Sequence, residues 1–375
     1  MRNLLALAAV VLGIVSVSAE TTAANRSEAV LRLLNSSAAG SPRAYAEAAA
    51  IVAADAAAGK PLPQFVMAIC ADEKSMPEKL RPSAETREKY LRASRGRIGQ
   101  LAEKDGNPLA MYLLAIEGGD TNLLRRAAEG GNVQAANAWG TALMREVDGP
   151  LPDPAAKSVM ARAFGFFRDA AATGDANGLY NLGMCYARGL GVEVDDDKAL
   201  GFFRAAAEKG QPQAVNNLGW FHLKGRGVPE DPVEAAKCFA KSADYGNPEG
   251  QLNYALALIR GEGVPVNERT AASLLLASAR QDNADAMNIY GMCVLKGRGV
   301  KPSPEIAFRW FRASADLGHP MAMDNLASCY EQGLGVAVSA EEAKWWRLRS
   351  LAVRGDEDAR RQVAEHDAAK SSASK

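Results

Sequence analysis

A Gly-x-Gly-Val motif recurs five times in the second half of this 375-residue chain and constrains its fold more than any other feature. Its copies begin at Gly189, Gly225, Gly261, Gly297 and Gly333, so each starts 36 residues after the previous one. Self-similarity at a fixed period of this size is typical of a repeat array. The chain is therefore predicted to form one extended array, although its length alone would also suit two or three globular domains.

Each repeat is predicted to contain two helices. Apolar residues follow helical spacing both before the motif, as in 179–186, and after it, as in 199–206, whereas a strand would alternate. A good N-cap residue stands four positions after each second glycine, where its side-chain oxygen can accept from free first-turn amides. These residues are Asp195, Asp231, Asn267, Ser303 and Ser339. Left-handed C-caps at Gly210, Gly246 and Gly318 would end the second helix.

The glycine pair itself has two interpretations. It can form a tight turn between the helices, in which glycine supplies positive φ at little cost. It can also suggest a phosphate-binding loop, but such a loop follows a strand and does not recur in every repeat. We therefore expect a structural turn.

This pattern resembles the Sel-one-like repeat, a helix–turn–helix relative of the tetratricopeptide repeat. The motifs that carry the resemblance are Leu182-Gly183 to Tyr186, the Gly-x-Gly-Val loop, and Lys198-Ala199 with Phe202-Phe203. It covers residues 107–355 well and 42–106 more loosely. The resemblance implies an all-α fold, a right-handed superhelical α-solenoid of helix–turn–helix repeats, that acts as an adaptor scaffold and not as a catalyst.

The first 19 residues are predicted to be a secretory signal peptide. Arg2 supplies a positive start, residues 4–17 an apolar core, and Val17-Ser18-Ala19 a small-residue cleavage site. The apolar core is short for a membrane span, although a retained anchor is the alternative. We therefore expect an exported protein, periplasmic or secreted, with no transmembrane segment after cleavage.

The rest of the chain divides by the regularity of its repeats. Residues 20–106 are expected to form degenerate N-terminal helical repeats or a cap, and 107–355 the main array, with regular 36-residue repeats from about residue 175. Residues 356–375 are expected to form a charged capping helix, as solenoid ends need, followed by a disordered tail from Ser371.

Cysteine placement favours packing over disulfide formation. Cys70, Cys185, Cys293 and Cys329 occupy one column, by which we mean one equivalent position in different repeats. Equivalent positions in stacked repeats lie about 10 Å apart, beyond the disulfide limit of roughly 7 Å between Cα atoms. We interpret these cysteines as small buried hydrophobes.

No catalytic, metal or cofactor site is expected. The chain has three histidines, His222, His319 and His366, and none has a partner at metal-ligand spacing. Catalysis needs a base, a nucleophile or a metal cluster in convergence. Basic and acidic residues balance at 44 each, without a basic patch, so nucleic acid is not an expected partner.

A partner-binding face is predicted on the first helices, which should line the concave surface of a solenoid. One of their columns contains Asn181, Asn217, Asn253 and Asn325. A ladder of amides, each a donor and an acceptor, suits an extended peptide backbone. Alternatively, each asparagine ties down a neighbouring repeat. Trp220 would be an apolar anchor if exposed, or packing between repeats if buried.

Two functions from different classes remain. The first is an exported, non-enzymatic scaffold that binds a protein or peptide on the concave face, with a role in envelope regulation or assembly. The second is a cell-wall or carbohydrate-processing accessory with weak hydrolase activity, which would need an acid pair in one cleft. The sequence shows no such pair, and the scaffold is the favoured hypothesis.

Overall fold

The computed structural model describes residues 29–30, 42–71, 76–145 and 154–373. These parts of the chain are helical and contain no β-strand. The predicted signal peptide, residues 1–19, lies outside the described residues. The chain divides into two compact parts, Met1–Pro229 and Glu230–Lys375, which we call unit 1 and unit 2.

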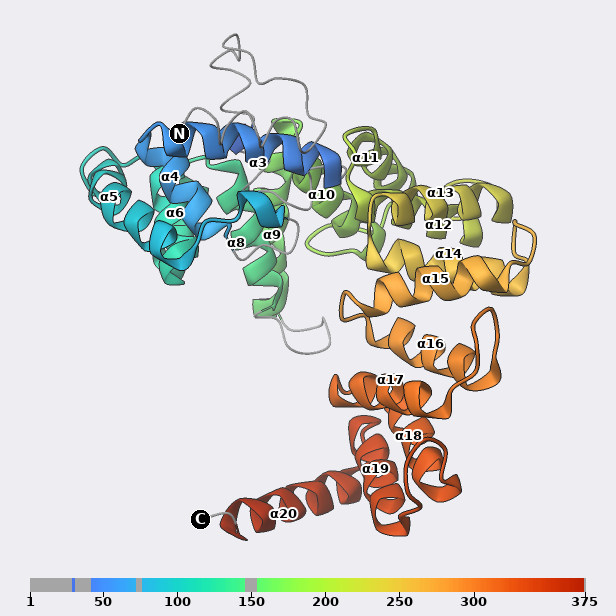
Figure 1. Ribbon diagram of the computed structural model, residues 1–375. Coiled ribbons are helices and arrows are strands. Elements are labelled where there is room, and N and C mark those ends of the chain that lie inside the picture. Colours follow the sequence, from blue (N-terminus) through green and yellow to red (C-terminus); the bar gives the residue numbers. More distant parts are fainter. Residues whose placement is uncertain (1–28, 31–41, 72–75, 146–153, 374–375) are drawn as a thin grey trace. The chain divides into compact units, whose positions relative to one another are not determined.

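Helix follows helix along both units (Figure 1). Unit 1 contains α3 (Pro42–Ala57), α4 (Pro61–Ile69), the 3₁₀ helix η2 (Glu78–Leu80), α5 (Ala84–Glu103), α6 (Pro108–Gly118), α7 (Thr121–Glu129), α8 (Val133–Arg145), α9 (Pro154–Ala172), α10 (Ala176–Arg188), α11 (Asp196–Glu208) and α12 (Pro212–Lys224). Unit 2 contains α13 (Pro232–Asp244), α14 (Pro248–Arg260), α15 (Glu268–Ala279), α16 (Ala284–Lys296), α17 (Pro304–Asp316), α18 (Pro320–Gln332), α19 (Ala340–Val353) and α20 (Glu357–Ala373).

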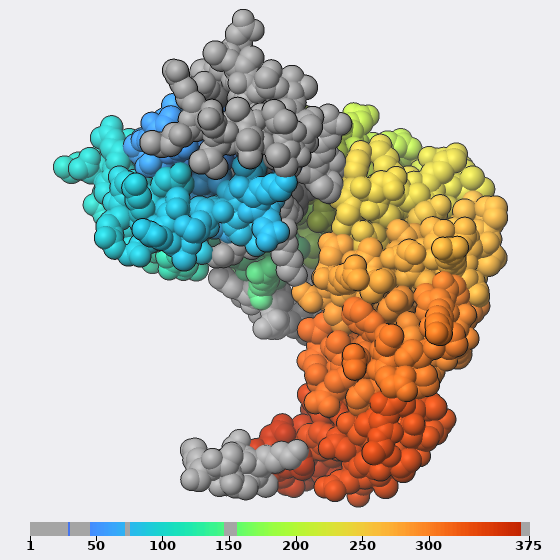
Figure 2. Space-filling view, viewed as in Figure 1, coloured from blue at the N-terminus to red at the C-terminus, as the bar shows by residue number. Residues whose placement is uncertain are grey.

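Sequence neighbours are also packing neighbours. The first and second helices of a repeat form antiparallel pairs, such as α10 with α11 in unit 1 and α16 with α17 in unit 2, and each pair contacts the next one within its unit. Figure 2 shows this order in unit 2, where the colours pass from yellow through orange to red without returning. The predicted α-solenoid is confirmed.

Helix starts are fixed by side-chain caps. All five predicted second-helix caps are present, for example Asp195 accepting from the Lys198 amide. The first helices are capped in the same way, by residues that were not predicted to be caps: Asn107, Asp175, Gln211, Asn247, Asn283 and His319. Gln211 and His319 are unusual N-cap types, which explains why residue preference alone does not find them.

The two glycines of each motif have different roles. The first is the left-handed C-cap of the first helix, as at Gly261 with φ 73°. The second also has positive φ but lies against the backbone of the preceding repeat. A Cβ on Gly263 would lie 1.9 Å from the carbonyl oxygen of Pro232. Glycine is therefore needed there for close approach as well as for backbone conformation.

A column of buried serines ties three second helices of unit 2, α15, α17 and α19, to the first helix of the same repeat. The hydroxyls of Ser278, Ser314 and Ser350 donate to the carbonyls of Pro248, Ala284 and Pro320, over 2.8, 2.7 and 3.1 Å. All three serines are fully buried. Each bond gives the buried hydroxyl a partner in the first turn of the paired first helix and fixes the register of the two helices within one repeat.

The C-terminal helix ends later in the chain than the sequence predicted. A disordered tail was expected from Ser371, but α20 extends to Ala373. The segment 366–373 contains neither glycine nor proline, so nothing in it stops the helix. The α20 helix packs on α19, and its His366 ring lies over Trp345 with ring centroids 3.8 Å apart. This contact covers the end of the array.

Candidate functional site

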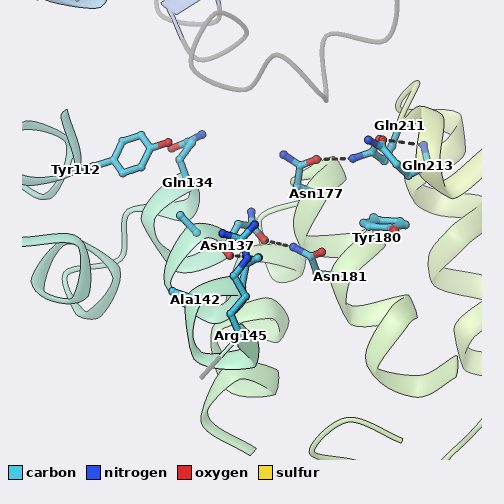
Figure 3. A pocket seen from close by; sticks show the side chains of 12 residues that line it. Tyr112, Gln134, Asn137, Ala142, Arg145, Asn177, Tyr180, Asn181, Gln211 and Gln213 are labelled. Atoms are coloured by element: carbon cyan, nitrogen blue, oxygen red, sulfur yellow. Dashed lines mark hydrogen bonds between the residues drawn. The ribbon is translucent and has the colours of Figure 1, made fainter. Parts of the chain in front are cut away.

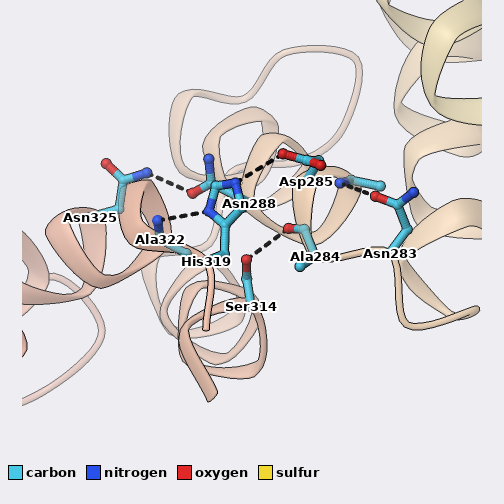
Figure 4. Close-up of polar contacts among 9 residues, drawn as sticks. Asn283, Ala284, Asp285, Asn288, Ser314, His319, Ala322 and Asn325 are labelled. Carbon is cyan, nitrogen blue, oxygen red and sulfur yellow. Dashed lines mark hydrogen bonds and ion pairs between the residues drawn. The ribbon is translucent and has the colours of Figure 1, made fainter. Parts of the chain in front are cut away.

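The predicted asparagine column lies on first helices and is half-buried. Asn181 and Asn217 belong to α10 and α12 of unit 1, and Asn253 and Asn325 belong to α14 and α18 of unit 2. Figure 4 shows the surroundings of Asn325, which points toward the preceding first helix, α16.

Three of these asparagines bond to the preceding first helix. Asn181 Nδ2 donates to Asn137 Oδ1 over 3.2 Å, and Asn325 Nδ2 donates to Asn288 Oδ1 over 2.8 Å. Asn217 Nδ2 lies 3.1 Å from the sulfur of Met184. Sulfur is a weak acceptor, so this last contact is the weakest of the three. The geometry favours the interpretation that the column ties repeats together, while its role in partner binding stays a prediction.

The one departure from the column supports that interpretation. Ile289 replaces the donor asparagine, and Leu252 replaces the acceptor in the repeat before it. Both apolar side chains pack against the same core cluster of unit 2. Donor and acceptor are replaced together in this repeat, as expected for a pair that bridges two repeats, because a half-buried amide without its partner would be costly. At Asn217 the donor is kept although the acceptor position holds Tyr180, and its amide contacts Met184 instead.

A polar pocket lies beside this column in unit 1 (Figure 3). It has a volume of about 400 Å³, and most of its lining comes from α8 and α10 together with the start of α12. Its described lining residues are Tyr112, Gln134, Asn137, Ala138, Thr141, Ala142, Arg145, Asn177, Tyr180, Asn181, Gln211 and Gln213. Six of these twelve side chains are carboxamides, so the surface offers donors and acceptors in nearly equal number.

Several of these polar groups are not engaged with the protein. Gln213 Oε1 is buried without a hydrogen-bond partner among the described residues. Gln134 likewise makes no side-chain hydrogen bond within the described part of the chain. By contrast, Asn177 accepts from Gln211, and Asn137 donates to Asp175 over 2.8 Å. The available groups therefore lie at Gln134 and Gln213.

These two glutamines do not stand out in the sequence when repeats are compared by asparagine identity alone. Gln134, Asn177 and Gln213 share one column, with spacings of 43 and 36 residues that match the repeat lengths there. We call this the amide column. Comparing side-chain chemistry at equivalent positions of successive repeats would have identified this column.

Trp220 is 40% exposed on α12. Its column also holds Ile116 of α6, which is 44% exposed, and the half-buried Met184. Trp220 does not line the pocket. Of the predicted site residues, the pocket includes Asn181 alone; Asn217 and Trp220 lie elsewhere on the first helices of unit 1, and Asn253 and Asn325 lie in unit 2.

The cysteines have the chemistry of packed residues. All five are unpaired, and four are buried. Desolvation by burial raises the pKa of Cys185 to about 12 and that of Cys329 to about 11. Burial also raises the pKa of the half-buried Cys238 to about 11. Because the thiolate is the reactive form, these groups are weak nucleophiles at neutral pH.

His319 is engaged in structural contacts. His319 Nδ1 accepts from the Ala322 amide over 3.1 Å, and its Nε2 lies 2.9 Å from Asp285 Oδ1 (Figure 4). This arrangement leaves the proton of the neutral ring on Nε2.

No group of three potential metal ligands occurs among the described residues. In the same part of the chain, no helix has the length and apolarity to cross a membrane.

Comparison with known proteins agrees with the repeat pattern. Five consecutive segments match the Sel1 repeat: residues 176–211, 212–247, 248–283, 284–319 and 320–348. The structure is similar to a Sel1 repeat protein from Oxalobacter formigenes, at 27% identity over 66% of this chain and 99% of that one, with a TM-score of 0.57. No curated protein matches the sequence.

A second solved structure shows the same fold. It is c5321, a protective antigen present in uropathogenic Escherichia coli strains that displays an SLR fold, at 26% identity over 83% of this chain and 65% of that one, with a TM-score of 0.51. Stacked helix pairs and repeat-to-repeat ties define an α-helical repeat protein of the solenoid class. Its regular repeats, residues 176–348, are Sel1 repeats, and its fold is similar to that of solved Sel1-like repeat proteins. Such repeats generally mediate protein–protein interaction.

Proposed function

We propose that this protein is a non-enzymatic scaffold that binds an extended segment of a partner protein across α8, α10 and α12. The observation that carries the proposal is the pocket of about 400 Å³ with uncommitted amides at Gln134 and Gln213. A carboxamide matches the peptide group, because each offers one carbonyl acceptor and N–H donors. The two amides belong to α8 and α12, and Asn177 of α10, which lies between them in the column, accepts from Gln211.

The alternative of a weak hydrolase finds no support at this pocket. A glycosidase needs two carboxyl groups flanking the bond that it cleaves. The described lining residues include no aspartate or glutamate. The pocket offers amides, hydroxyls and one guanidinium, which suit binding better than proton transfer.

Photo-crosslinking tests the proposed site. A photoreactive amino acid at Ala142, in the pocket, should crosslink to a defined segment of one protein in an envelope extract. The same amino acid at Arg204, on the exposed face of α11, is the matched control and should not. The Gln134→Ala/Gln213→Ala variant should reduce the Ala142 crosslink without changing the melting temperature. Equal crosslinking from both positions would contradict the site.

We also propose that the protein is exported and acts in envelope regulation or assembly, on the basis of the signal-like segment 1–19. Export predicts a mature chain that begins at Glu20. The intact mass of protein recovered from the producing cells measures this directly. A mass that retains residues 1–19 would count against cleavage.

A further inference from the structure

The first helices α8, α10 and α12 of unit 1 carry positive charge alone. None of them contains aspartate or glutamate, and each ends in an exposed basic residue: Arg145, Arg188 or Lys224. These three positions form one column, which we call the basic column. They lie 43 and 36 residues apart in the sequence, so a search for contiguous basic segments does not detect them. Arg145 also lines the pocket.

The fold does not require a base at these positions. A cation at a helix C-terminus interacts favourably with the helix dipole, but α18 ends in Gln332 with the same left-handed glycine cap. Helix termination therefore does not account for the basic column.

These cations are also uncommitted. Arg145, Arg188 and Lys224 form no ion pair with any described residue. Arg226, two residues beyond Lys224, behaves differently: it pairs with Asp196 and donates to the Ala187 carbonyl over 2.8 Å. The same region thus contains one arginine used in the fold and three exposed cations without an ion pair among the described residues.

Unit 2 provides an internal contrast. At its equivalents of the amide column stand Glu249 and Asp285, in place of the glutamines and asparagine of unit 1. Its helices α14 and α16 thereby combine an acid with their terminal bases, Arg260 and Lys296. An acidic ligand would meet repulsion on these helices but not on α8, α10 and α12.

We propose that unit 1 selects extended peptide segments that carry an acidic side chain at every third residue. This inference rests on the proposed function and adds the chemistry of the partner. Packed helices lie about 8–10 Å apart, and an extended chain advances about 3.3 Å per residue. Three residues of the ligand therefore span one repeat, and each third side chain meets the next member of the basic column. The amide column holds the intervening backbone.

A nucleic acid fits this surface less well than a peptide. A single strand is held by a continuous positive groove together with stacked aromatic side chains. Here the cations occur once per repeat, and Arg145 lines a pocket together with carboxamides. Charge spacing and amide chemistry both favour an acidic protein segment.

Fluorescence anisotropy with short labelled peptides tests the proposal on the full mature chain. One peptide has glutamates at its first, fourth and seventh positions, and its isomer has the same residues with the glutamates adjacent. A third replaces glutamate by glutamine. The spaced acidic peptide should bind at least about tenfold more tightly than the glutamine peptide, about 1.4 kcal/mol, and more tightly than its isomer. Added salt should reduce the advantage over glutamine.

Substitutions in the two units test which basic residues cause the preference for the acidic peptide. Arg145→Gln/Arg188→Gln/Lys224→Gln should abolish the preference for acid but keep the affinity for the glutamine peptide. Arg260→Gln/Lys296→Gln, the matched change in unit 2, should keep the preference. Each substitution is exposed, and circular dichroism melting checks the fold. If the triple variant does not fold, Lys224→Gln alone should show a partial loss, and the salt dependence of the wild type provides a second measurement.

Each contradicting result would overturn a different part of the proposal. Equal affinity for acidic and neutral peptides would overturn the acidic selectivity and leave the scaffold function standing. A preference that survives the triple variant would overturn the basic column as its cause. A short single-stranded oligonucleotide that binds more tightly than the acidic peptide would overturn the partner class. Absence of binding by every peptide would overturn the inference, while crosslinking from Ala142 would decide the scaffold function separately.

Discussion

At the scale of single residues, the second glycine of four of the five motifs is among the most constrained positions in the repeat; at Gly227 a Cβ would lie 3.2 Å from the nearest backbone oxygen. Gly191, Gly263, Gly299 and Gly335 all have positive φ, and a Cβ at each would lie within 2.4 Å of a backbone oxygen of the preceding repeat. Backbone cannot move aside as a flexible side chain can. The motif is therefore needed for a contact between repeats as well as for a turn within one repeat.

This difference predicts unequal costs for the same substitution. Gly261→Ala places a methyl group at positive φ, which costs about 1–2 kcal/mol, but its nearest neighbour is a movable Val266 methyl at 3.2 Å. Gly263→Ala has the same backbone cost and also meets the Pro232 carbonyl at 1.9 Å. We expect Gly263→Ala to lower the free energy of unfolding by about 1–3 kcal/mol more than Gly261→Ala. Urea unfolding of both variants measures this, and equal losses would contradict the close approach.

The buried thiols give a residue-scale prediction about pH. Burial raises the pKa of Cys185 to about 12, above the value of about 8.5 for an unfolded thiol. The stabilisation from holding this proton is therefore fully present below the unfolded pKa and is lost as pH rises through the folded pKa. Native Cys185 should resist iodoacetamide at pH 8.5 and react once guanidinium unfolds the chain. Mass spectrometry locates the label, and rapid native labelling of Cys185 would contradict its burial.

At the scale of helices, neighbouring repeats are joined by side-chain hydrogen bonds as well as by apolar packing. Asn325 of α18 donates to Asn288 of α16, and Ser314 of α17 donates to the Ala284 carbonyl of α16. Asn288 and Ser314 are 3% and 0% exposed. Polar groups at that depth are costly without partners. The Asn325–Asn288 bond therefore makes one repeat depend on the next, whereas the Ser314 bond holds together the two helices of one repeat.

A double-mutant cycle tests the asparagine pair. Asn325→Ala should leave the buried Asn288 oxygen without its donor and cost about 1–3 kcal/mol of unfolding free energy. Asn288→Leu with Asn325→Ile copies the natural pair Leu252 and Ile289 and should recover much of that loss. A favourable coupling energy above about 0.5 kcal/mol shows direct interaction. If Asn325→Ala instead keeps its melting temperature and weakens partner capture, the binding interpretation of the column prevails.

The sequence predicts elements better than it predicts the candidate site. Helix order and the second-helix caps follow from local chemistry, since a cap such as Asp231 acts within three residues of itself. The pocket depends on which side chains of different repeats remain unpaired. Asn181 and Gln134 look alike as sequence, yet one bonds to Asn137 and the other makes no such bond within the described residues. That distinction arises from tertiary packing, so column chemistry alone did not give it.

At the scale of the whole molecule, the stability of a solenoid is approximately a sum of repeat and nearest-neighbour terms. The last repeat of unit 2 has a neighbour on one side, and α20 covers the other. Ala359 is 2% exposed, Arg360 Nε donates to the Ala352 carbonyl over 3.1 Å, and His366 lies over Trp345. These contacts make α20 a cap for α19.

Deletion of residues 357–375 should therefore loosen unit 2 from its end inward. Hydrogen exchange should speed up most in α18 and α19, less in α16 and α17, and not measurably in α13 and α14, because each interface passes on only part of the loss. His366→Ala is the matched control: it removes the ring contact with Trp345 but keeps Ala359 and Arg360, so α18 should stay protected. A uniform increase in exchange through α13–α19 would show that unit 2 unfolds as one cooperative body, whereas unchanged exchange in α19 would show that α20 does not cap the array.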